Sequence, residues 1–329
     1  MLCSVHTSPA SWTPSARAAT TEKEQAAMSA PEADQQATLS SESEYRAAVL
    51  GSPIEHSLSP VLHSAGYRAA GLEGWNYQRI ECTAEQLPEI VGNADASYRG
   101  FSVTMPGKFA ALEFADEVTE RARAIGSANT LVRETRDGST IWRADNTDCE
   151  GISGALHELV GEKAELGHVL LIGGGGTARP ALWALTQRGV DKVTVLNRSD
   201  RSEELLPLLE NTGVEAEFIN FERDLRDLAL SVDAIISTVP AKVLETRDAE
   251  LGHAPVLDVI YNPWPTPLAT CAASNGHLTV GGLVMLACQS YSQFEQFTGV
   301  DAPREEMREA LFRHVGWVSP TGVTRQNRR

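Results

Sequence analysis

The chain has 329 residues, enough for about two domains and a sizeable hydrophobic core. Hydrophobic residues make up 42% and charged residues 22%, as in ordinary soluble proteins, and no apolar stretch has the length of a membrane span. The formal net charge of −16 argues against a large nucleic-acid-binding surface. The five cysteines are not spaced as disulfide or metal-ligand pairs, so we expect no metal site and a cytoplasmic location.

The first residues differ in composition from the rest of the chain. Residues 1–41 are rich in Ala, Ser, Thr, Pro and Glu and lack the apolar segment of a signal peptide. The segment is neither Arg-rich nor poor in acidic residues, which argues against a transit peptide. We therefore expect residues 1–43 to form a disordered tail, with Met28 as an alternative start of the protein.

Predicted strands and helices then alternate in the pattern of an α/β protein. Strands are expected at residues 45–50, 75–81 and 101–104, and helices at residues 84–91 and after Ser59 and Pro106. Ser59 is expected to cap its helix, with Pro60 in the first helical position. These elements predict a mostly parallel sheet in a first domain over residues 44–148.

A second domain is expected over residues 149–280. It begins with a predicted helix at residues 149–160 and continues with strands at residues 167–172, 192–196, 215–219, 234–237 and 256–259. The apolar run at residues 167–172 is typical of a central parallel strand that is buried on both faces. Further helices are predicted between Gly281 and Gly299 and over residues 304–314.

A glycine-rich loop follows the strand at residues 167–172 and precedes a helix. Gly173, Gly175 and Ala178 fit the pattern G-x-G-x-x-G/A of dinucleotide-binding loops. Glycine lets the backbone approach a pyrophosphate, and the free N–H groups of the helix N-terminus then face the anion. The strand–loop–helix context makes a dinucleotide site the favoured interpretation, with a ligand-free turn as the alternative.

The end of the next strand distinguishes NAD from NADP. An acidic residue at this point would bind the ribose 2′-hydroxyl, but the sequence has Asn197, followed by Arg198 and, three residues later, Arg201. A guanidinium group suits a 2′-phosphate, so NADP is favoured. Asp200 would oppose a phosphate, and two solvated surface arginines are the alternative interpretation.

Four short elements of the first domain carry polar side chains at predicted strand ends and helix starts. Ser57 and Ser59 would present hydroxyl groups beside a helix N-terminus, which suits a carboxylate, although capping alone also explains Ser59. Thr104 and Lys108 lie where ligands bind in open α/β sheets, although a single lysine is more often a surface residue. The remaining two are residues 124–131, with Asn129, and residues 145–148. Asp148 either caps a helix or pairs with Lys108 for proton transfer.

These elements, in this order and ahead of this glycine loop, resemble the shikimate dehydrogenase family over roughly residues 45–315. Further similar segments are Asp258–Pro263, Thr266–Leu268 and Gly281–Gln289. The resemblance implies two α/β domains, a substrate-binding domain and a Rossmann-type NADP domain, with a cleft between them. It also implies that residues 281–329 form helices that return to the substrate domain.

The resemblance implies roles for individual residues. Lys108 and Asp148 correspond to the catalytic pair of the family. The implied substrate-binding residues are Ser57, Ser59, Thr104, Asn129, Tyr261 and Gln289. The implied cofactor-binding residues are Gly173, Gly174, Gly175, Gly176, Thr177, Asn197, Arg198, Ser199, Val259 and Gly282.

The sequence departs from the family pattern at several positions. Ser102 stands where many members have Asn, and Ser64 replaces an Asn that often follows the residue at position 63. Residues 238–241 lack a common Gly-Met, which puts details of the nicotinamide pocket in doubt. Arg201 lies one residue closer to Asn197 than a second phosphate-binding residue often does.

The implied activity is the reversible, NADPH-dependent reduction of 3-dehydroshikimate to shikimate, in chorismate and aromatic amino acid biosynthesis. A monomer or homodimer with a small-molecule substrate and no nucleic-acid or membrane partner is expected. The alternatives are an NAD-dependent quinate/shikimate dehydrogenase, a non-catalytic shikimate-binding paralogue, and another reductase with a similar glycine loop. The missing acidic residue at Asn197 disfavours the first, and retention of Lys108 with Asp148 disfavours the second.

Overall fold

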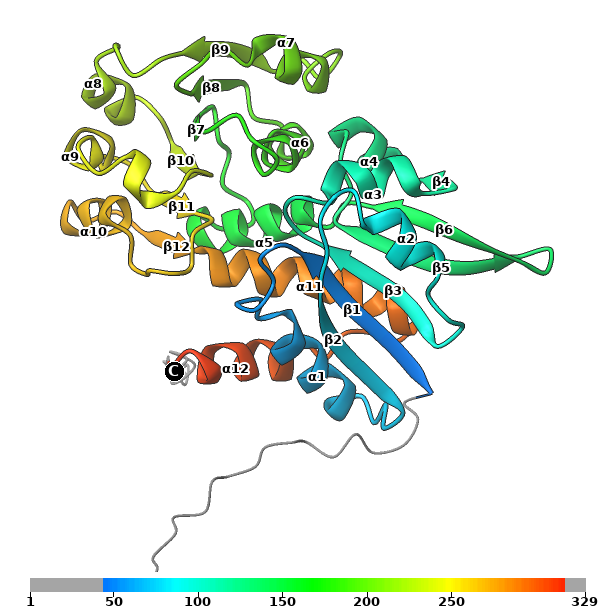
Figure 1. Cartoon of the computed structure of the whole chain (residues 1–329). Helices are drawn as coiled ribbons and strands as arrows, with labels where there is room; N and C mark the ends of the chain where they lie inside the picture. Colours follow the sequence, from blue (N-terminus) through cyan, green and yellow to red (C-terminus); the bar gives the residue numbers. More distant parts are fainter. Residues whose placement is uncertain (1–43, 317–329) are drawn as a thin grey trace, which may run out of the picture. The chain divides into compact units, whose positions relative to one another are not determined.

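A computed structural model describes residues 44–316 and contains two β-sheets with helices around them (Figure 1). The expected disordered tail at residues 1–43 and the end of the chain after residue 316 lie outside the described residues. The first sheet has the strand order β2 (Trp75–Glu81), β1 (Tyr45–Gly51), β3 (Tyr98–Val103), β5 (Thr130–Arg136), β6 (Ser139–Asp145), β4 (Glu117–Val118).

The first sheet combines a parallel part with an antiparallel hairpin. β1 pairs in parallel with both β2 and β3, whereas β3, β5 and β6 pair antiparallel. The hairpin between β5 and β6 turns at Asp137 and Gly138, whose φ angles are 50° and 78°. Positive φ at both positions is the geometry of a type I′ turn, which favours Asp-Gly. This hairpin was not predicted from the sequence.

The three helix starts predicted in the first half of the chain differ from the structure by one to three residues. The helices are α1 (Ser59–Ala69), α2 (Leu87–Gly92), α3 (Lys108–Phe114) and α4 (Glu120–Ile125). The predicted cap at Ser59 is wrong: Ser59 is the first helical residue, and Leu58 at the cap position already has helical dihedral angles. Pro106 does not open the following helix, which begins at Lys108.

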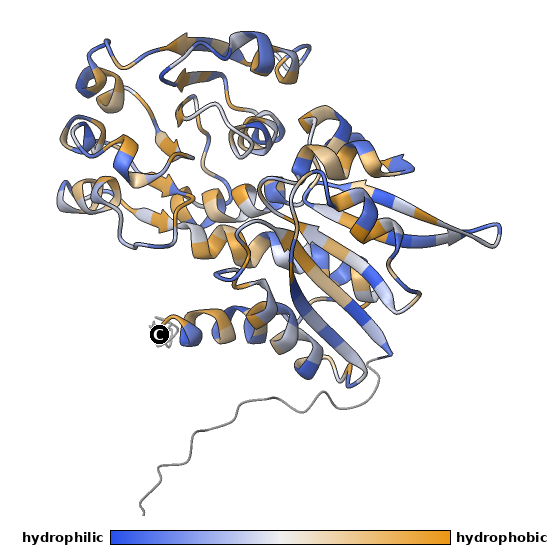
Figure 2. Cartoon of the chain, viewed as in Figure 1, coloured by the Kyte–Doolittle hydropathy of each residue, from blue (hydrophilic) through white to orange (hydrophobic). Residues whose placement is uncertain are grey.

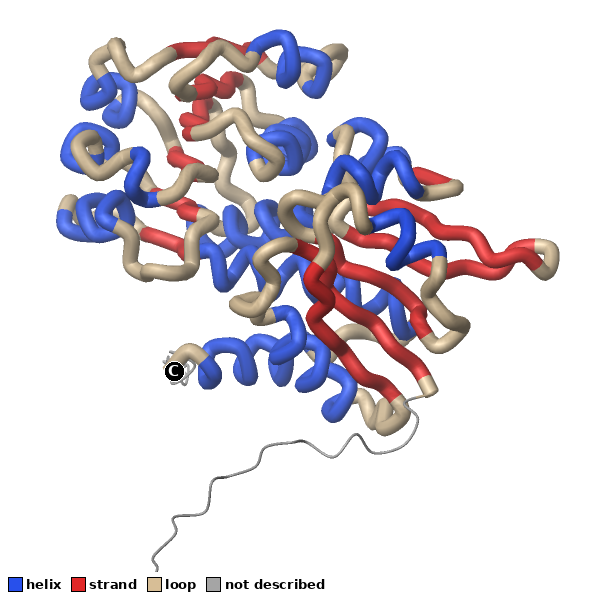
Figure 3. The backbone as a smooth tube through the Cα atoms, viewed as in Figure 1, coloured by secondary structure: helices blue, strands red, loops and turns tan. Residues whose placement is uncertain are grey.

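The second sheet is entirely parallel, as expected of a Rossmann-type domain. Its strand order is β12 (Thr279–Gly281), β11 (Val256–Asp258), β10 (Ala234–Ser237), β7 (His168–Ile172), β8 (Lys192–Leu196), β9 (Glu215–Ile219). The remaining helices there are α6 (Ala178–Arg188), α7 (Ser202–Leu205), α8 (Leu225–Leu230), α9 (Asp248–Leu251) and α10 (Pro267–Ser274). Figure 3 shows these strands and helices alternating along the chain.

The central strand β7 is covered on both faces. Val169 and Leu171 pack into one cluster with α5 (Asp148–Val160) and α6, and Leu170 and Ile172 pack into another with α8, α9 and α10. All four side chains are fully buried. This arrangement confirms that the apolar run is a central strand and explains why it has no hydrophobic alternation.

Two long helices connect the two sheets. α5 leads from the first sheet to the second, and α11 (Gly282–Thr298) returns and packs along α5 and against β3 and β5. Figure 2 shows hydrophobic residues gathered where α5 and α11 lie together. Gly100 of β3 permits this packing, because a Cβ atom there would lie 2.2 Å from the ring of Phe297. The last helix, α12 (Arg304–His314), packs on α1.

Candidate active site

A cavity of about 300 Å³ lies at the carboxyl ends of β1 and β3, beside the start of α11. It brings together residues from loops and helices that are far apart in the chain. The cavity is lined by all eight residues predicted for catalysis and substrate binding: Lys108, Asp148, Ser57, Ser59, Thr104, Asn129, Tyr261 and Gln289. Their position at this edge agrees with the general location of ligands in open α/β sheets.

The only ion pair among the described residues lining this cavity joins Lys108 and Asp148. Lys108 Nζ lies 2.5 Å from Asp148 Oδ2, and the two side chains are 18% and 9% exposed. Asn129 donates a hydrogen bond to the other carboxylate oxygen at 2.9 Å. Lys108 is the first residue of α3 and Asp148 the first residue of α5, so two helix starts bring the pair together. A charged, hydrogen-bonded pair of this kind can hold and transfer a proton.

Two serine hydroxyl groups at the start of α1, those of Ser57 and Ser59, also belong to the lining. Ser57 Oγ accepts a weak hydrogen bond from the backbone N–H of Ser59 at 3.4 Å. Arg79 of β2 donates two hydrogen bonds to the carbonyl oxygen of Ser57, at 2.9 and 2.6 Å, and so fixes the turn that carries both serines. Hydroxyl groups at the positive end of a helix dipole suit a carboxylate ligand.

A chain of hydrogen bonds connects Tyr77 with Ser102, Gln293 and Asn129, of which the last three line the cavity. Most of this chain was not predicted from the sequence. The Tyr77 hydroxyl donates to Ser102 Oγ at 2.6 Å, and Ser102 donates to Gln293 Oε1 at 2.8 Å. Gln293 Nε2 in turn donates to the carbonyl oxygen of Asn129 at 3.1 Å. Ser102 therefore keeps one free lone pair and no free proton, so it can accept a hydrogen bond from a ligand but not donate one.

The spacing of Gln293 offered a signal that could have identified it. Gln293 lies four residues after Gln289 on α11, so both side chains project from one face of that helix. His63 does not line the cavity but stacks on Tyr77, with ring centroids 4.1 Å apart. Burial lowers the pKa of His63 to about 3 and raises the pKa of Tyr77, so both rings are neutral near pH 7.

Three predicted cofactor residues, Thr177, Val259 and Gly282, line the same cavity. Thr177 follows the glycine loop, and Val259 and Gly282 lie at the carboxyl ends of β11 and β12. Gly282 permits a close approach, because a Cβ atom there would lie 2.0 Å from the carbonyl oxygen of Val259. The Lys108–Asp148 pair and these residues therefore share one cavity.

The glycine loop has the geometry that the dinucleotide motif requires. Gly173 has a φ of 109°, and a Cβ atom there would lie 2.4 Å from the Thr238 hydroxyl. Gly175 and Gly176 have no atom within 4 Å of a hypothetical Cβ, so their backbone is accessible to a ligand. α6 begins directly after the loop at Ala178 and presents its N-terminus there.

The predicted 2′-phosphate residues line a second cavity of about 260 Å³, which contains Asn197, Arg198, Ser199 and Arg201. Arg201 forms an ion pair with Glu204, and Asn197 donates to the carbonyl oxygen of Ser199 at 2.9 Å. Asp200 lines the same cavity, and its carboxylate accepts a hydrogen bond from the backbone N–H of Ser202 at 2.8 Å. Free guanidinium donors and open glycine backbone fit a phosphorylated dinucleotide.

Comparisons with known proteins agree with this arrangement. Three family models match the chain: the shikimate dehydrogenase substrate-binding domain at residues 49–131, shikimate/quinate 5-dehydrogenase at residues 156–255, and the shikimate 5′-dehydrogenase C-terminal domain at residues 282–312. The NADP(+) shikimate dehydrogenase of Methanopyrus kandleri is 37% identical over 81% of this chain and 94% of its own length. The chain belongs to the shikimate dehydrogenase family.

Solved structures of this family share the fold. A Mycobacterium tuberculosis shikimate dehydrogenase structure is 48% identical, with a TM-score of 0.75 over 81% of this chain and 98% of that chain. A Thermus thermophilus shikimate 5-dehydrogenase, solved with NADP(H) and shikimate, is 29% identical, with a TM-score of 0.67 over 82% and 99% of the two chains. No helix within residues 44–316 is long and apolar enough to cross a membrane.

Proposed function

We propose that the chain catalyses the reversible, NADPH-dependent reduction of 3-dehydroshikimate to shikimate. One observation carries this proposal: the Lys108–Asp148 pair lies in the same cavity as Ser57 and Ser59 and as the residues at the cofactor side. A cyclic hydroxy acid that bound its carboxylate at the serines would thereby extend toward the ion pair. Family membership supports this substrate class.

The proposed chemistry requires positioning and one proton. When bound, NADPH supplies the hydride that the ring ketone carbon receives. Lys108 Nζ would donate a hydrogen bond to the ketone oxygen as negative charge develops, and it would either transfer its proton or stabilise that charge. Asp148 keeps the ammonium group of Lys108 in place and accepts a hydrogen bond from Asn129.

The proposed substrate contacts rest on the position of these side chains in the cavity and on family membership. Ser57 and Ser59 would bind the carboxylate, and Thr104, Asn129 and Gln289 would bind ring hydroxyl groups. Tyr261 also lines the pocket, and burial raises the pKa of its hydroxyl group. A phenol that stays protonated can donate a hydrogen bond to an anionic substrate.

The proposed cofactor contacts divide between the two cavities. The loop Gly173–Thr177 would hold the pyrophosphate, and Val259 and Gly282 would contact the nicotinamide. Asn197, Arg198 and Ser199 would hold the 2′-phosphate. We further propose that residues 44–148 form the substrate-binding domain and residues 149–280 the cofactor-binding domain. Residues 281–316 would then form the helices that return to the substrate-binding domain. The cytoplasmic location and the monomeric or dimeric state expected from the sequence stay predictions.

Absorbance of the reduced nicotinamide at about neutral pH tests the proposal directly. Purified protein receives shikimate or quinate, each with NADP or NAD, in four parallel reactions. We expect rapid reduction with shikimate and NADP and much slower reduction in the other three. A preference for quinate with NAD would contradict the assigned substrate and cofactor. Tight shikimate binding by folded but inactive protein would instead favour a non-catalytic binding protein.

A further inference from the structure

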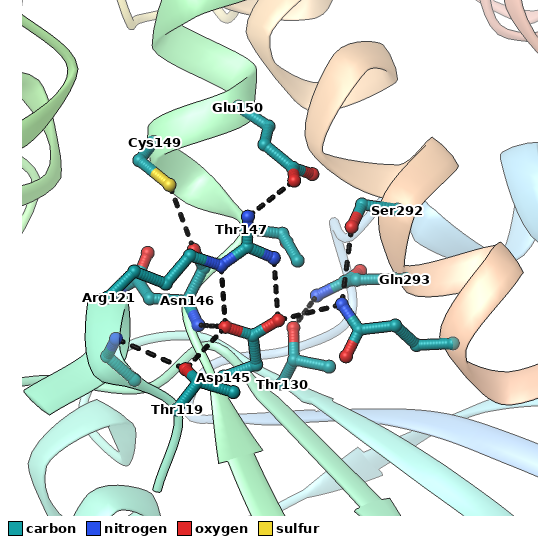
Figure 4. A network of polar contacts seen from close by, with 12 residues as sticks. Thr119, Arg121, Thr130, Asp145, Asn146, Thr147, Cys149, Glu150, Ser292 and Gln293 are labelled. Carbon is teal, nitrogen blue, oxygen red and sulfur yellow. Dashed lines mark hydrogen bonds and ion pairs between the residues drawn. The ribbon is translucent and has the colours of Figure 1, made fainter. Parts of the chain in front are cut away.

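A second carboxylate, that of Asp145, lies buried three residues before Asp148 and makes an unusually complete set of hydrogen bonds (Figure 4). It is at the end of β6, and its side chain does not line the active-site cavity. Its five hydrogen bonds come from Arg121 Nε and Nη2 at 2.6 Å each, Thr119 at 2.7 Å, the backbone N–H of Asn146 at 2.8 Å and Gln296 at 2.9 Å.

Arg121 of α4 contacts the chain on both sides of Asp148. Its guanidinium group forms a two-pronged pair with Asp145 and, through Nη1, a second ion pair with Glu150 in the first turn of α5. Figure 4 shows the guanidinium group between the two carboxylates. One side chain therefore fixes residues 145 and 150 relative to each other. A planar guanidinium group can do this because its donors point in fixed directions, whereas a lysine ammonium group lacks this geometry.

The electrostatics of this cluster favour the charged forms. Burial raises the pKa of Asp145, but the hydrogen bonds and charge of Arg121 outweigh it, so the pKa lies below its ordinary value. Burial lowers the pKa of Arg121, and its bonds to Asp145 and Glu150 raise it by more. Both groups are therefore charged near neutral pH, and loss of Arg121 leaves the buried Asp145 carboxylate without its cationic partner.

The segment between these anchors carries Asp148 with little freedom. The backbone N–H of Thr147 donates to Asn129 Oδ1 at 2.8 Å, and that of Asp148 donates to Asn146 Oδ1 at 3.1 Å. The Asp148 carboxylate itself has hydrogen bonds only to Lys108 and Asn129 among the described residues. Its direction toward Lys108 is therefore set by the backbone of residues 145–150, which Arg121 holds.

Helix α4, which carries Arg121, also contacts helix α6 of the second domain. Arg179, the second residue of α6, donates to the carbonyl oxygen of Ile125 at the end of α4 at 2.7 Å. α4 thus touches both the segment that carries Asp148 and the helix that follows the glycine loop. A displacement of about 1 Å between reacting groups can lower a rate by about 100-fold, so such a connection bears on catalysis.

We propose that Arg121 and Asp145 are positioning residues of the reaction, which act through Asp148 by fixing residues 145–150 against Lys108. This inference rests on the proposed function, because it takes the Lys108–Asp148 pair as the catalytic pair. It predicts a defect in the chemical step rather than in binding, since neither side chain lines the cavity.

Steady-state kinetics of three variants of the full chain tests the proposal, with shikimate and NADP as substrates. Arg121→Met should lower kcat by about 10- to 100-fold and change KM for either substrate by less than about threefold. Arg121→Lys should recover part of kcat, because it keeps the charge and loses the two-pronged geometry. Asp145→Asn, which preserves volume, should lower kcat with the same unchanged KM values.

Arg247→Met is the matched control. Arg247 lies in the other half of the molecule, forms an ion pair with Glu250 and has a side-chain exposure of 26%, against 22% for Arg121. Its loss should lower the melting temperature but leave kcat within about twofold of the original value.

The outcomes separate the two proposals. If Arg121→Met does not fold, the folded Arg121→Lys and Asp145→Asn proteins decide, and normal kcat in both would overturn the positioning role. The same conclusion would follow if the variants raised KM with unchanged kcat, or if Arg247→Met lost as much kcat. An unaltered chain that is inactive toward shikimate with NADP would instead refute the proposed function.

Discussion

Lys108 Nζ and Asp148 Oδ2 lie 2.5 Å apart, although 40 residues separate them in the chain. Each is the first residue of a helix that follows a strand of the first sheet, so the sheet edge brings them together. The backbone N–H of Ala128 also donates to the carbonyl oxygen of Lys108 at 3.0 Å, which ties the lysine to the loop that carries Asn129. Backbone contacts among three separate segments thus position the pair.

Arg79 offers a test of how the serine turn is held. Its two hydrogen bonds to the Ser57 carbonyl oxygen fix the turn, but the side chain is exposed, so the effect should be modest. We expect Arg79→Gln to raise KM for shikimate about threefold to tenfold with little change in kcat or in KM for NADP. Arg68→Gln, an equal charge change at an exposed site on α1, should leave all three constants unaltered. A normal KM for shikimate in Arg79→Gln would contradict this role.

Arg198 offers a test of cofactor choice. Its guanidinium group lines the second cavity and has no ion-pair partner among the described residues. A charge-assisted hydrogen bond contributes about 1.5–3 kcal/mol, so Arg198→Gln should raise KM for NADP by about tenfold or more. KM for NAD, which lacks the phosphate, should not change. Arg223→Gln is the control, because Arg223 follows β9, is 61% exposed and does not line the second cavity. Equal effects on both cofactors would show that Arg198 does not distinguish them.

The agreement between sequence and structure follows from the physical strength of each signal. The strands at residues 192–196 and 234–237 match the structure because a buried parallel strand needs a short apolar run between turn residues. The β5–β6 hairpin was missed because its outer half is exposed and polar, although Asp137-Gly138 is a strong hairpin signal. Helix starts were misplaced because capping preferences are weaker than tertiary contacts.

The residues of the site that directly follow strand ends could be predicted from the sequence, because the carboxyl ends of parallel strands meet at one edge of a sheet. All eight predicted catalytic and substrate-binding residues line one cavity, whereas their individual roles stay predictions. Tyr77, Gln293 and Arg121 were not predicted, because their part depends on which side chains three separate elements bring together. Single polar residues such as Tyr77 and Arg121 carry no sequence signal for such a contact, whereas the four-residue spacing of Gln289 and Gln293 on α11 offered one.

His63 should make the protein sensitive to acid. Its pKa is about 3 in the folded protein and near 6.5 in the unfolded chain, so below pH 6.5 the unfolded chain binds a proton that the folded protein excludes. Stability should therefore fall by up to about 1.4 kcal/mol per pH unit from this residue as the pH decreases from about 6.5 toward 3. In urea unfolding at several pH values, His63→Phe should remove this component and His157→Phe, at an exposed site on α5, should not. Parallel pH curves for His63→Phe and the unaltered chain would be evidence against it.

Asp248 should have the opposite dependence. Burial, followed by the charge of Asp258, raises the pKa of Asp248 to about 6, above its ordinary value of 3.8. The folded protein then binds the proton more tightly than the unfolded chain, so this residue costs stability as the pH rises from about 4 to 6. After discounting for solvent screening, Asp248→Asn should increase the free energy of unfolding at pH 7.5 by about 1 kcal/mol and at pH 4 by much less. Asp301→Asn, at an exposed loop position, is the control, and an equal change at both pH values would contradict the assignment.

The measurement that tests the central claim most directly is the single-turnover rate of Lys108→Ala with NADPH and 3-dehydroshikimate. Absorbance of the reduced nicotinamide follows the chemical step, and fluorescence titration follows binding of each ligand separately. If Lys108 stabilises the developing alkoxide beside Asp148, the rate should fall by about 100-fold or more while both ligands bind with nearly unchanged affinity. A normal single-turnover rate, or a loss confined to ligand affinity, would contradict the assignment of this pair as the catalytic centre.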